Sequence, residues 1–164
     1  MIFLTVGTQF PFDRLVKAVD DAIVRGICTD EVYGQIGETT YQPKGFRAVA
    51  SLDKRQFDKC FREAWGVIGH AGMGTIAMAL EMNKPLLVLP RCKRFGEVVN
   101  DHQVAIACKF EQLGHLLVAH GPDEVAGKMG LLRGFQPTPR PIQPEAVAGR
   151  IAEFLNRLSG KGLG

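Results

Sequence analysis

The segment Trp65-Gly66-Val67-Ile68-Gly69-His70-Ala71-Gly72-Met73-Gly74-Thr75 decides the fold of this chain. Its first four residues form an apolar run typical of a buried strand, and a helical pattern follows from Thr75 to Met82. The glycines between the two let the backbone turn sharply and approach a ligand closely. A strand, a glycine-rich turn and a helix in this order indicate one unit of an α/β sheet.

The same alternation continues on both sides of this segment. It predicts a single Rossmann-like parallel sheet with helices on both faces, an α/β fold. Ligands bind such sheets beyond the carboxyl ends of the strands, so the loops after Val6, Ala50, Ile68 and Leu89 are the candidates for a site. The further predicted strands cover residues 2–6, 31–36, 46–50, 86–89 and 116–119, and the further helices cover 12–25, 53–64 and 101–110 and a last one that opens at Pro122.

The length of 164 residues fits one domain, which we place at residues 1–135. Residues 136–144 contain four prolines and are predicted to form a stiff linker. Residues 145–158 repeat apolar residues at helical spacing and predict an amphipathic helix. The second segment therefore spans residues 136–164.

Composition narrows the class of protein. A formal charge of +3, with Lys and Arg spread along the chain, does not support nucleic-acid binding. The four cysteines lie far apart without a CxxC pair, which favours reduced thiols in the cytoplasm over a zinc site or disulfides. The apolar start ends at Gly7 without a basic region, and no apolar run approaches the roughly 20 residues of a membrane span. We expect no transmembrane segment.

The glycine-rich turn is the strongest candidate site. Free N–H groups and the dipole at the start of the following helix favour a phosphate, and His70 and Thr75 can add side-chain donors. A plain glycine turn is an equally good interpretation of the spacing alone. A P-loop is excluded because no GK[ST] sequence follows. A dinucleotide fingerprint fits weakly, because Ala77 takes the third glycine position and basic residues stand where an acid is expected.

Two other loops carry polar groups at strand ends. Gly7-Thr8-Gln9 can offer backbone donors to a ligand, although an ordinary turn explains it as well. Asn100-Asp101-His102-Gln103 can bond sugar hydroxyls or can simply cap a helix. Arg91, Lys93 and Arg94 could pair with an anion, but a solvated basic loop is the favoured interpretation.

Together, His70-Ala71-Gly72-Met73-Gly74-Thr75, Lys84-Pro85 and Asn100-Asp101-His102-Gln103 resemble the C-terminal domain of family 28 glycosyltransferases. The small soluble subunits that consist of this domain alone are most similar. These are the donor-binding subunit of the two-part N-acetylglucosaminyltransferase of dolichol-linked oligosaccharide synthesis and exopolysaccharide subunits of the PssE type. The opening Val6-Gly7-Thr8-Gln9 with Phe12-Asp13-Arg14-Leu15 is similar to the start of such subunits.

This resemblance implies the C-terminal half of a GT-B enzyme that is divided into two polypeptides. The chain would bind the UDP-sugar without a metal or other cofactor, and a membrane-associated partner of the PssD type would bind a lipid-diphosphate-linked acceptor. The protein would be cytoplasmic and would reach the inner face of the membrane through that partner. The resemblance gives His70 the catalytic role. It places Gly7, Thr8, Gln9, Gly72, Met73, Gly74 and Thr75 at the diphosphate, Asn100, Asp101 and Gln103 at the donor sugar, and the loop around Ser51 and Leu52 at the uracil through backbone contacts.

One position departs from the family pattern. A glutamate usually holds the ribose hydroxyls six residues after the second glycine of the loop, and this chain has Met78 there. Glu81, one helical turn on, is the candidate replacement. Two alternatives stay open, namely a non-catalytic accessory subunit of such a complex and a nicotinamide-dependent oxidoreductase.

Overall fold

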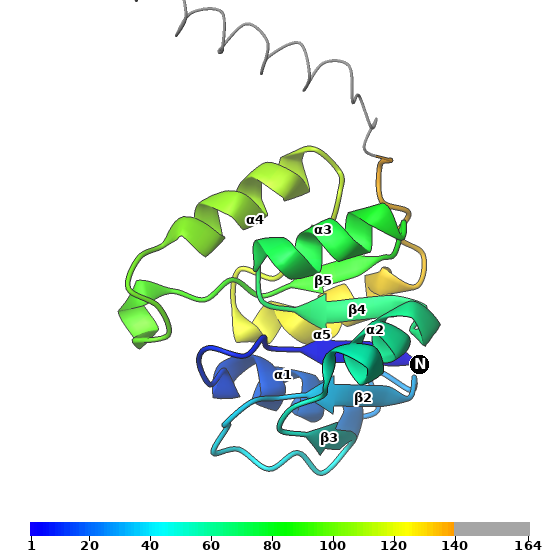
Figure 1. Ribbon diagram of the computed structural model, residues 1–164, viewed down its shortest axis with the longest axis vertical. Helices are drawn as coiled ribbons and strands as arrows, with labels where there is room; N and C mark the ends of the chain where they lie inside the picture. The colour runs from blue at the N-terminus through cyan, green and yellow to red at the C-terminus, as the bar shows by residue number, and fades with distance from the viewer. Residues whose placement is uncertain (140–164) are drawn as a thin grey trace, which may run out of the picture.

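The computed structural model describes residues 1–139. Strands and helices alternate along the chain, except that the third strand follows the second without a helix between them (Figure 1). The strands are β1 (Ile2–Thr5), β2 (Val32–Gln35), β3 (Arg47–Val49), β4 (Gly66–Gly69), β5 (Leu86–Val88) and β6 (Leu117–Val118). The helices are α1 (Asp13–Val24), α2 (Lys54–Glu63), α3 (Met73–Glu81), the short 3-10 helix η1 (Lys93–Phe95), α4 (His102–Gln112) and α5 (Pro122–Leu132).

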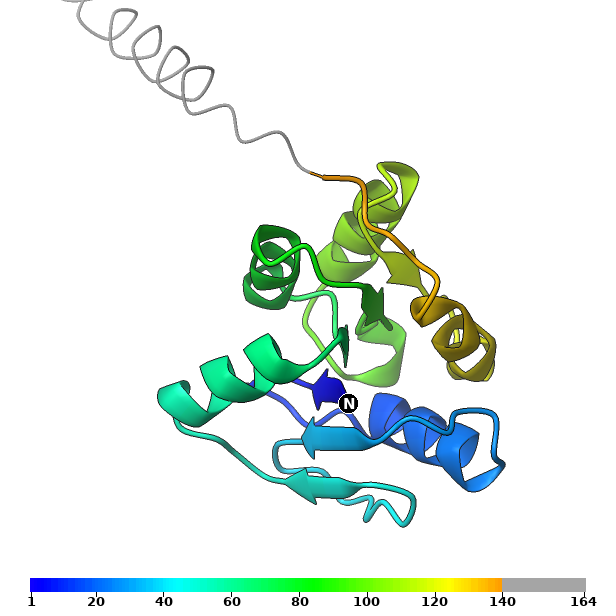
Figure 2. The same cartoon turned by 90° about the vertical axis from the view of Figure 1, so that its right-hand side faces the viewer.

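The strands form one parallel sheet in the order β3-β2-β1-β4-β5-β6 (Figure 2). This order reverses direction between β1 and β4, where Ile2 lies beside Gly66 and Thr5 lies beside Gly69. The loops after β1 and β4 diverge there to opposite faces of the sheet. A reversal of this kind leaves a crevice at the carboxyl edge, the usual ligand position in open α/β sheets.

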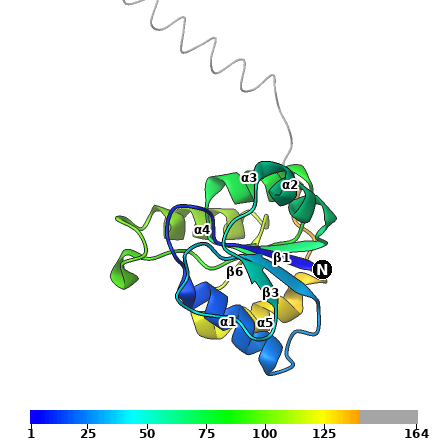
Figure 3. The same ribbon diagram turned by 60° about the horizontal axis from the view of Figure 1, so that its bottom comes forward.

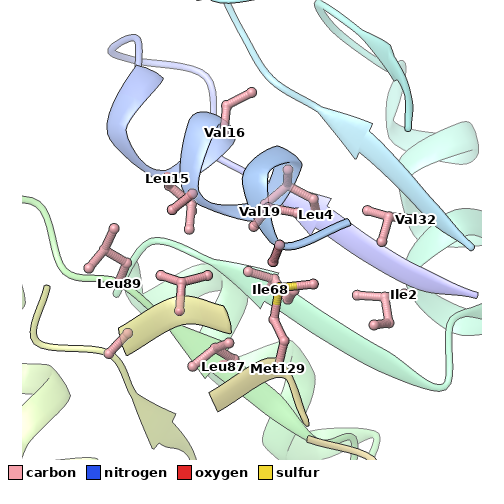
Figure 4. Close-up of a cluster of buried hydrophobic side chains, with 14 of the residues drawn as sticks. Ile2, Leu4, Leu15, Val16, Val19, Val32, Ile68, Leu87, Leu89 and Met129 are labelled. Atoms are coloured by element: carbon pink, nitrogen blue, oxygen red, sulfur yellow. The ribbon is translucent and has the colours of Figure 1, made fainter. Parts of the chain in front are cut away.

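Helices cover both faces of the sheet. Helices α1 and α5 lie on one face, and α2, α3 and α4 lie on the other (Figures 1 and 3). The α1–α5 face holds one buried apolar cluster (Figure 4), whose members include Ile2, Leu4, Leu15, Val19, Ile68, Leu87 and Met129. The opposite face holds a second cluster around Phe3, Phe61, Val67, Ile76 and Val88. Near-continuous apolar strands are expected when both faces of a parallel sheet are buried.

The predicted α/β class and parallel sheet are confirmed, with differences at element ends. Helix α3 begins at Met73, two residues earlier than predicted, so Gly74 and Thr75 belong to its first turn. The 3-10 helix at Lys93–Phe95 was not predicted, because three residues carry no periodic signal. Of the predicted linker, Pro137 is buried, and the Thr138 N–H donates to the Gly114 carbonyl. The rest of that segment and the predicted helix at 145–158 lie outside the described residues.

No helix within residues 1–139 is long and apolar enough to cross a membrane.

Candidate functional site

The candidate site lies at the carboxyl edge of the sheet, where the loops after β1, β4 and β5 leave neighbouring strands. Residues Gly7–Pro11 follow β1, His70–Gly72 follow β4, and the stretch 89–101 follows β5. Parallel strands all end at one edge, so loops separated by more than 60 residues in sequence lie side by side there.

His70 is held between two glycines from different loops. A Cβ atom added to Gly72 would lie 2.3 Å from its Nε2, and one added to Gly7 would lie 2.8 Å from its Cε1. Gly7 also has a φ of 77°, which L-residues rarely adopt. These two glycines therefore make room for the imidazole between the loops after β1 and β4. The sequence predicted that Gly72 lets the backbone turn and approach a ligand, and the structure adds close packing of both glycines against one side chain.

The His70 imidazole is neutral at physiological pH. Burial, assisted by the Arg91 cation, lowers its pKa to about 4, and the Thr5 carbonyl opposes this shift. Among the described residues, its buried Nδ1 has no well-formed hydrogen bond. A neutral imidazole still carries one N–H donor, so His70 can donate to an anion without itself bearing charge. A bound anion would in turn stabilise the protonated ring.

The N-terminus of α3 presents unpaired backbone donors beside His70. Gly72 occupies the N-cap position, and no side chain accepts a hydrogen bond there. The N–H groups of Met73, Gly74 and Thr75 have no partner within a helix, while the Ile76 N–H donates to the Gly72 carbonyl. A Cβ atom at Gly74 would meet no atom within 4 Å, so this glycine leaves open space in front of the helix. The arrangement favours an anion.

A cavity of about 320 Å³ opens at the same edge of the sheet. It lies over the carboxyl ends of β1, β2 and β3, and it contains the predicted site residues Gly7, Thr8, Gln9 and Ser51. Gly7 both lines the cavity and contacts His70, so it is the residue that joins the two regions. The other residues lining the cavity are Phe10, Pro11, Gln35, Gly37, Glu38 and Ala50.

Arg91 joins the loops after β1 and β5. Its side chain is only 2% exposed; its guanidinium donates to the carbonyl of Val6 at 2.9 Å and to that of Phe10. It also stacks on the Phe12 ring, 4.9 Å from the centroid. The prediction of a solvated loop is therefore wrong for Arg91, because these carbonyls replace water around its charge. Lys93 and Arg94 are exposed, as that prediction expected.

The predicted sugar-binding residues start α4 and also order the loop before it. The Gln103 Oε1 accepts from the Arg91 N–H at 3.2 Å, and an Asp101 carboxylate oxygen accepts from the Lys93 N–H at 2.8 Å. The Asn100 Oδ1 accepts from the His102 N–H at 3.2 Å. Asp101 occupies the N-cap position of α4, but its side chain makes no capping hydrogen bond to that helix. Gln103 is thus indirectly connected to the β1 loop through Arg91.

An ion pair that the sequence did not single out anchors the same loop to α1. Arg14 donates to both carboxylate oxygens of Glu97, at 2.9 and 2.8 Å, and to the Pro90 carbonyl at 2.9 Å. Glu97 accepts a further bond from the Cys92 N–H. The two partners lie 83 residues apart, and only the fold brings them together. No spacing within the sequence could have indicated this contact.

The remaining predicted site residues lie elsewhere. Glu81 is the exposed last residue of α3, about 12 Å along the helix from its first turn. Met78 is partly buried against the second apolar cluster. Leu52 also packs against that cluster, so its side chain faces away from the cavity that Ser51 lines. The structure therefore does not bring Glu81 to the other predicted residues.

Two cavity residues with polar side chains were not predicted from the sequence. Gln35 ends β2 and Glu38 follows it, and both line the 320 Å³ cavity. Neither belongs to a recognisable motif. Their position at a strand end beside β1 was the only available signal, and the pairing of β2 with β1 cannot be read from the sequence.

Comparison with protein families gives one clear match. The model of the glycosyltransferase family 28 C-terminal domain matches residues 1–132. The chain is 39% identical over 151 residues to the UDP-N-acetylglucosamine transferase subunit ALG13 of Eremothecium gossypii, covering 91% of this chain and 70% of that protein. It is 35% identical over 123 residues to the mouse ALG13 subunit, covering 70% of this chain. The chain spans only 10% of the length of that mouse relative.

Among solved structures, the solution structure of ALG13 superimposes with a TM-score of 0.60 at 21% identity. The match covers 86% of this chain and 89% of that one, and it confirms the arrangement of strands and helices. The match to a C-terminal domain agrees with the prediction that the chain forms one half of a GT-B fold.

Proposed function

Because this chain belongs to the glycosyltransferase family 28 C-terminal domain family, we propose that it is the donor-binding subunit of a two-component UDP-sugar glycosyltransferase. Its relatives named as UDP-N-acetylglucosamine transferase subunits support this activity and make UDP-N-acetylglucosamine the first donor to test. The acceptor is proposed to be a lipid-diphosphate-linked sugar, used in glycolipid or exopolysaccharide synthesis. The observation that carries the proposal is the placement of His70 against the uncapped N-terminus of α3, beside the 320 Å³ cavity.

In the proposed reaction, the bond between the sugar and the UDP diphosphate breaks, and negative charge develops on the departing UDP. The N–H groups at the start of α3 and the His70 donor are positioned to stabilise that charge. These donors are fixed before substrate binds, so little reorganisation is needed during the reaction.

The helix end supplies the positive potential, and we therefore expect UDP binding without a divalent cation. Calorimetry in EDTA and in Mg²⁺ should give the same affinity.

A second protein is proposed to cover the carboxyl edge and to provide the acceptor site and the general base. Four large apolar side chains are exposed at this edge, which is unusual for a surface that only meets water. Phe10 follows β1, Met73 starts α3, and Phe95 and Val99 follow β5; their exposures are 48, 48, 49 and 82%. We propose that they contact the partner, which would hold the chain at the inner face of the membrane.

A nicotinamide-dependent oxidoreductase is the alternative from another class. In such enzymes the glycine-rich turn follows the first strand of the sheet, whereas here it follows β4. Titration of the chain with UDP, UDP-N-acetylglucosamine and NADH distinguishes the possibilities. We expect the two uridine nucleotides to bind and NADH not to bind. Binding of NADH alone would support the oxidoreductase, and binding of no nucleotide would support a non-catalytic accessory subunit.

The His70→Ala variant tests the site itself. Loss of one donor to a charged phosphate corresponds to about 1.5–3 kcal/mol, so UDP affinity should fall roughly 10- to 100-fold. His120→Ala is the matched control, because His120 is exposed, follows β6 and pairs with Glu111 of α4. Unchanged UDP affinity in His70→Ala, with the fold intact by circular dichroism, would remove the phosphate role of His70.

A further inference from the structure

Gln35 is buried without a partner for its side-chain oxygen. It is the last residue of β2, it is 2% exposed, and its Oε1 has no hydrogen-bond partner within residues 1–139. A buried unpaired acceptor of this kind costs roughly 1–3 kcal/mol. Gln35 lines the 320 Å³ cavity, so a ligand there can supply the missing donor.

The sheet register places Gln35 in line with the anion site. Gln35 pairs with Thr5 of β1, and Thr5 pairs with Gly69 of β4. Residues in register on neighbouring parallel strands point to the same face, and Phe3 and Val67 identify this face as the one that α2 and α3 cover. Gln35 therefore lies two strand spacings, roughly 10 Å, from the strand end that leads into the His70 loop.

Gly69 allows β4 and the first turn of α3 to pack closely at this row. A Cβ atom on Gly69 would lie 2.9 Å from the Thr5 carbonyl and 3.5 Å from the Thr75 methyl group, so a larger residue would not fit there. The row therefore connects the Gln35 end of β2, through Thr5, to the end of β4 that precedes α3.

Glu38 adds a second acceptor to the same cavity. It follows β2 by three residues and is exposed, so its carboxylate can face a ligand from the rim. Phosphate oxygens are acceptors and cannot satisfy either group. A uracil ring offers one N–H between two carbonyl oxygens, which would oppose the carboxylate. A vicinal diol offers two adjacent O–H donors and matches both acceptors.

We propose that Gln35 and Glu38 bind a vicinal diol of the donor nucleotide, in place of the glutamate that this chain lacks at Met78. This inference rests on the proposed function. The diol belongs either to the ribose or to the transferred sugar, and both present the same pair of donors.

The test compares the affinities of UDP, 2′-deoxy-UDP, 3′-deoxy-UDP and UDP-N-acetylglucosamine by calorimetry. If the ribose is the ligand, the wild-type chain should bind UDP about tenfold more tightly than the deoxy analogues, and Gln35→Met and Glu38→Ala should each lose most of that preference. If the sugar is the ligand, the variants should instead lose the extra affinity of UDP-N-acetylglucosamine over UDP. Either result supports the diol site.

Two controls distinguish loss of the diol site from loss of the fold and from failure of the proposed function. Gln35→Met removes an unpaired acceptor at similar volume, so the unliganded melting temperature should stay equal or rise. Glu31→Ala removes an exposed acid just before β2, at the end of the strand opposite Gln35. It should leave the ratios between the nucleotide affinities unchanged. If the wild type binds UDP but Gln35→Met and Glu38→Ala leave every affinity ratio between the nucleotides unchanged, the diol site alone is overturned. Absence of UDP binding by the wild type would overturn the proposed function and the diol site with it.

Discussion

The Gly72 Cα and the His70 imidazole are packed so closely that a methyl group on Gly72 would lie 2.3 Å from the ring Nε2. Gly72→Ala should therefore push the imidazole out of its place against Gly7. We expect a loss of about 1–3 kcal/mol in the free energy of unfolding and at least about a tenfold loss in UDP affinity. Urea denaturation and calorimetry measure the two effects. Unchanged stability and affinity would show that the ring has room to move.

Gly74→Ala should separate folding from binding. Gly74 lies in the first turn of α3 with no atom near its missing Cβ, so alanine should stabilise the helix by about 0.5–1 kcal/mol. The same methyl group would occupy the space in front of the helix, and UDP affinity should fall. Gly127→Ala in α5 is the control, because its Cβ is also unobstructed and lies away from the site. That control should gain stability without losing affinity.

The pKa of His70 predicts that acid lowers the stability of the folded protein. The unfolded chain protonates this histidine near pH 6.5, whereas the folded chain does so only near its pKa of about 4. The unfolded state therefore binds more protons between these values, and stability falls as pH decreases from about 7 towards 4. The loss attributable to His70 is about 3 kcal/mol. His70→Gln has no such proton, so its urea midpoint should fall less over this range; equal losses would contradict the assignment.

The Arg14–Glu97 pair should contribute measurably to stability, unlike most surface ion pairs. Its side chains are 14% and 11% exposed, and the contact is bidentate. Arg14→Lys loses the second hydrogen bond and should cost about 1.5–3 kcal/mol. Lys17→Ala in the same helix removes the exposed pair with Asp21 and should change stability by less than about 1 kcal/mol. Similar effects from the two substitutions would show that burial of the first pair is unimportant.

The hydrophobic pattern was enough to predict the sheet and its five long helices, because the central strands β1, β4 and β5 are buried along their whole length. The order of the predicted elements also placed the glycine-rich turn at the end of a strand, between β4 and α3. It could not predict that Gly7 and Gly72 enclose His70, because this contact joins two loops through the pairing of β1 with β4. The burial of Arg91 was missed for the same reason, since the carbonyls that surround it come from Val6 and Phe10.

Gln35 shows a different limit. A lone glutamine at the end of a short apolar run indicates only where the strand stops. Its meaning depends on the register with Thr5, on burial and on the absence of a hydrogen-bond partner for its oxygen among the described residues. None of these properties has a sequence signature. Glu81, by contrast, looked suitable from helical spacing, but it lies at the far end of α3.

The position of β1 in the middle of the sheet also governs when the protein can assemble. Ile2 leaves the ribosome well before one of its neighbours in the sheet, Gly66. Contacts between such distant residues form slowly, because a long loop must close before they contribute energy. During synthesis, one edge of the apolar strand β1 therefore stays unpaired until β4 has left the ribosome. Protection of the nascent chain over that interval is therefore a requirement set by strand order alone.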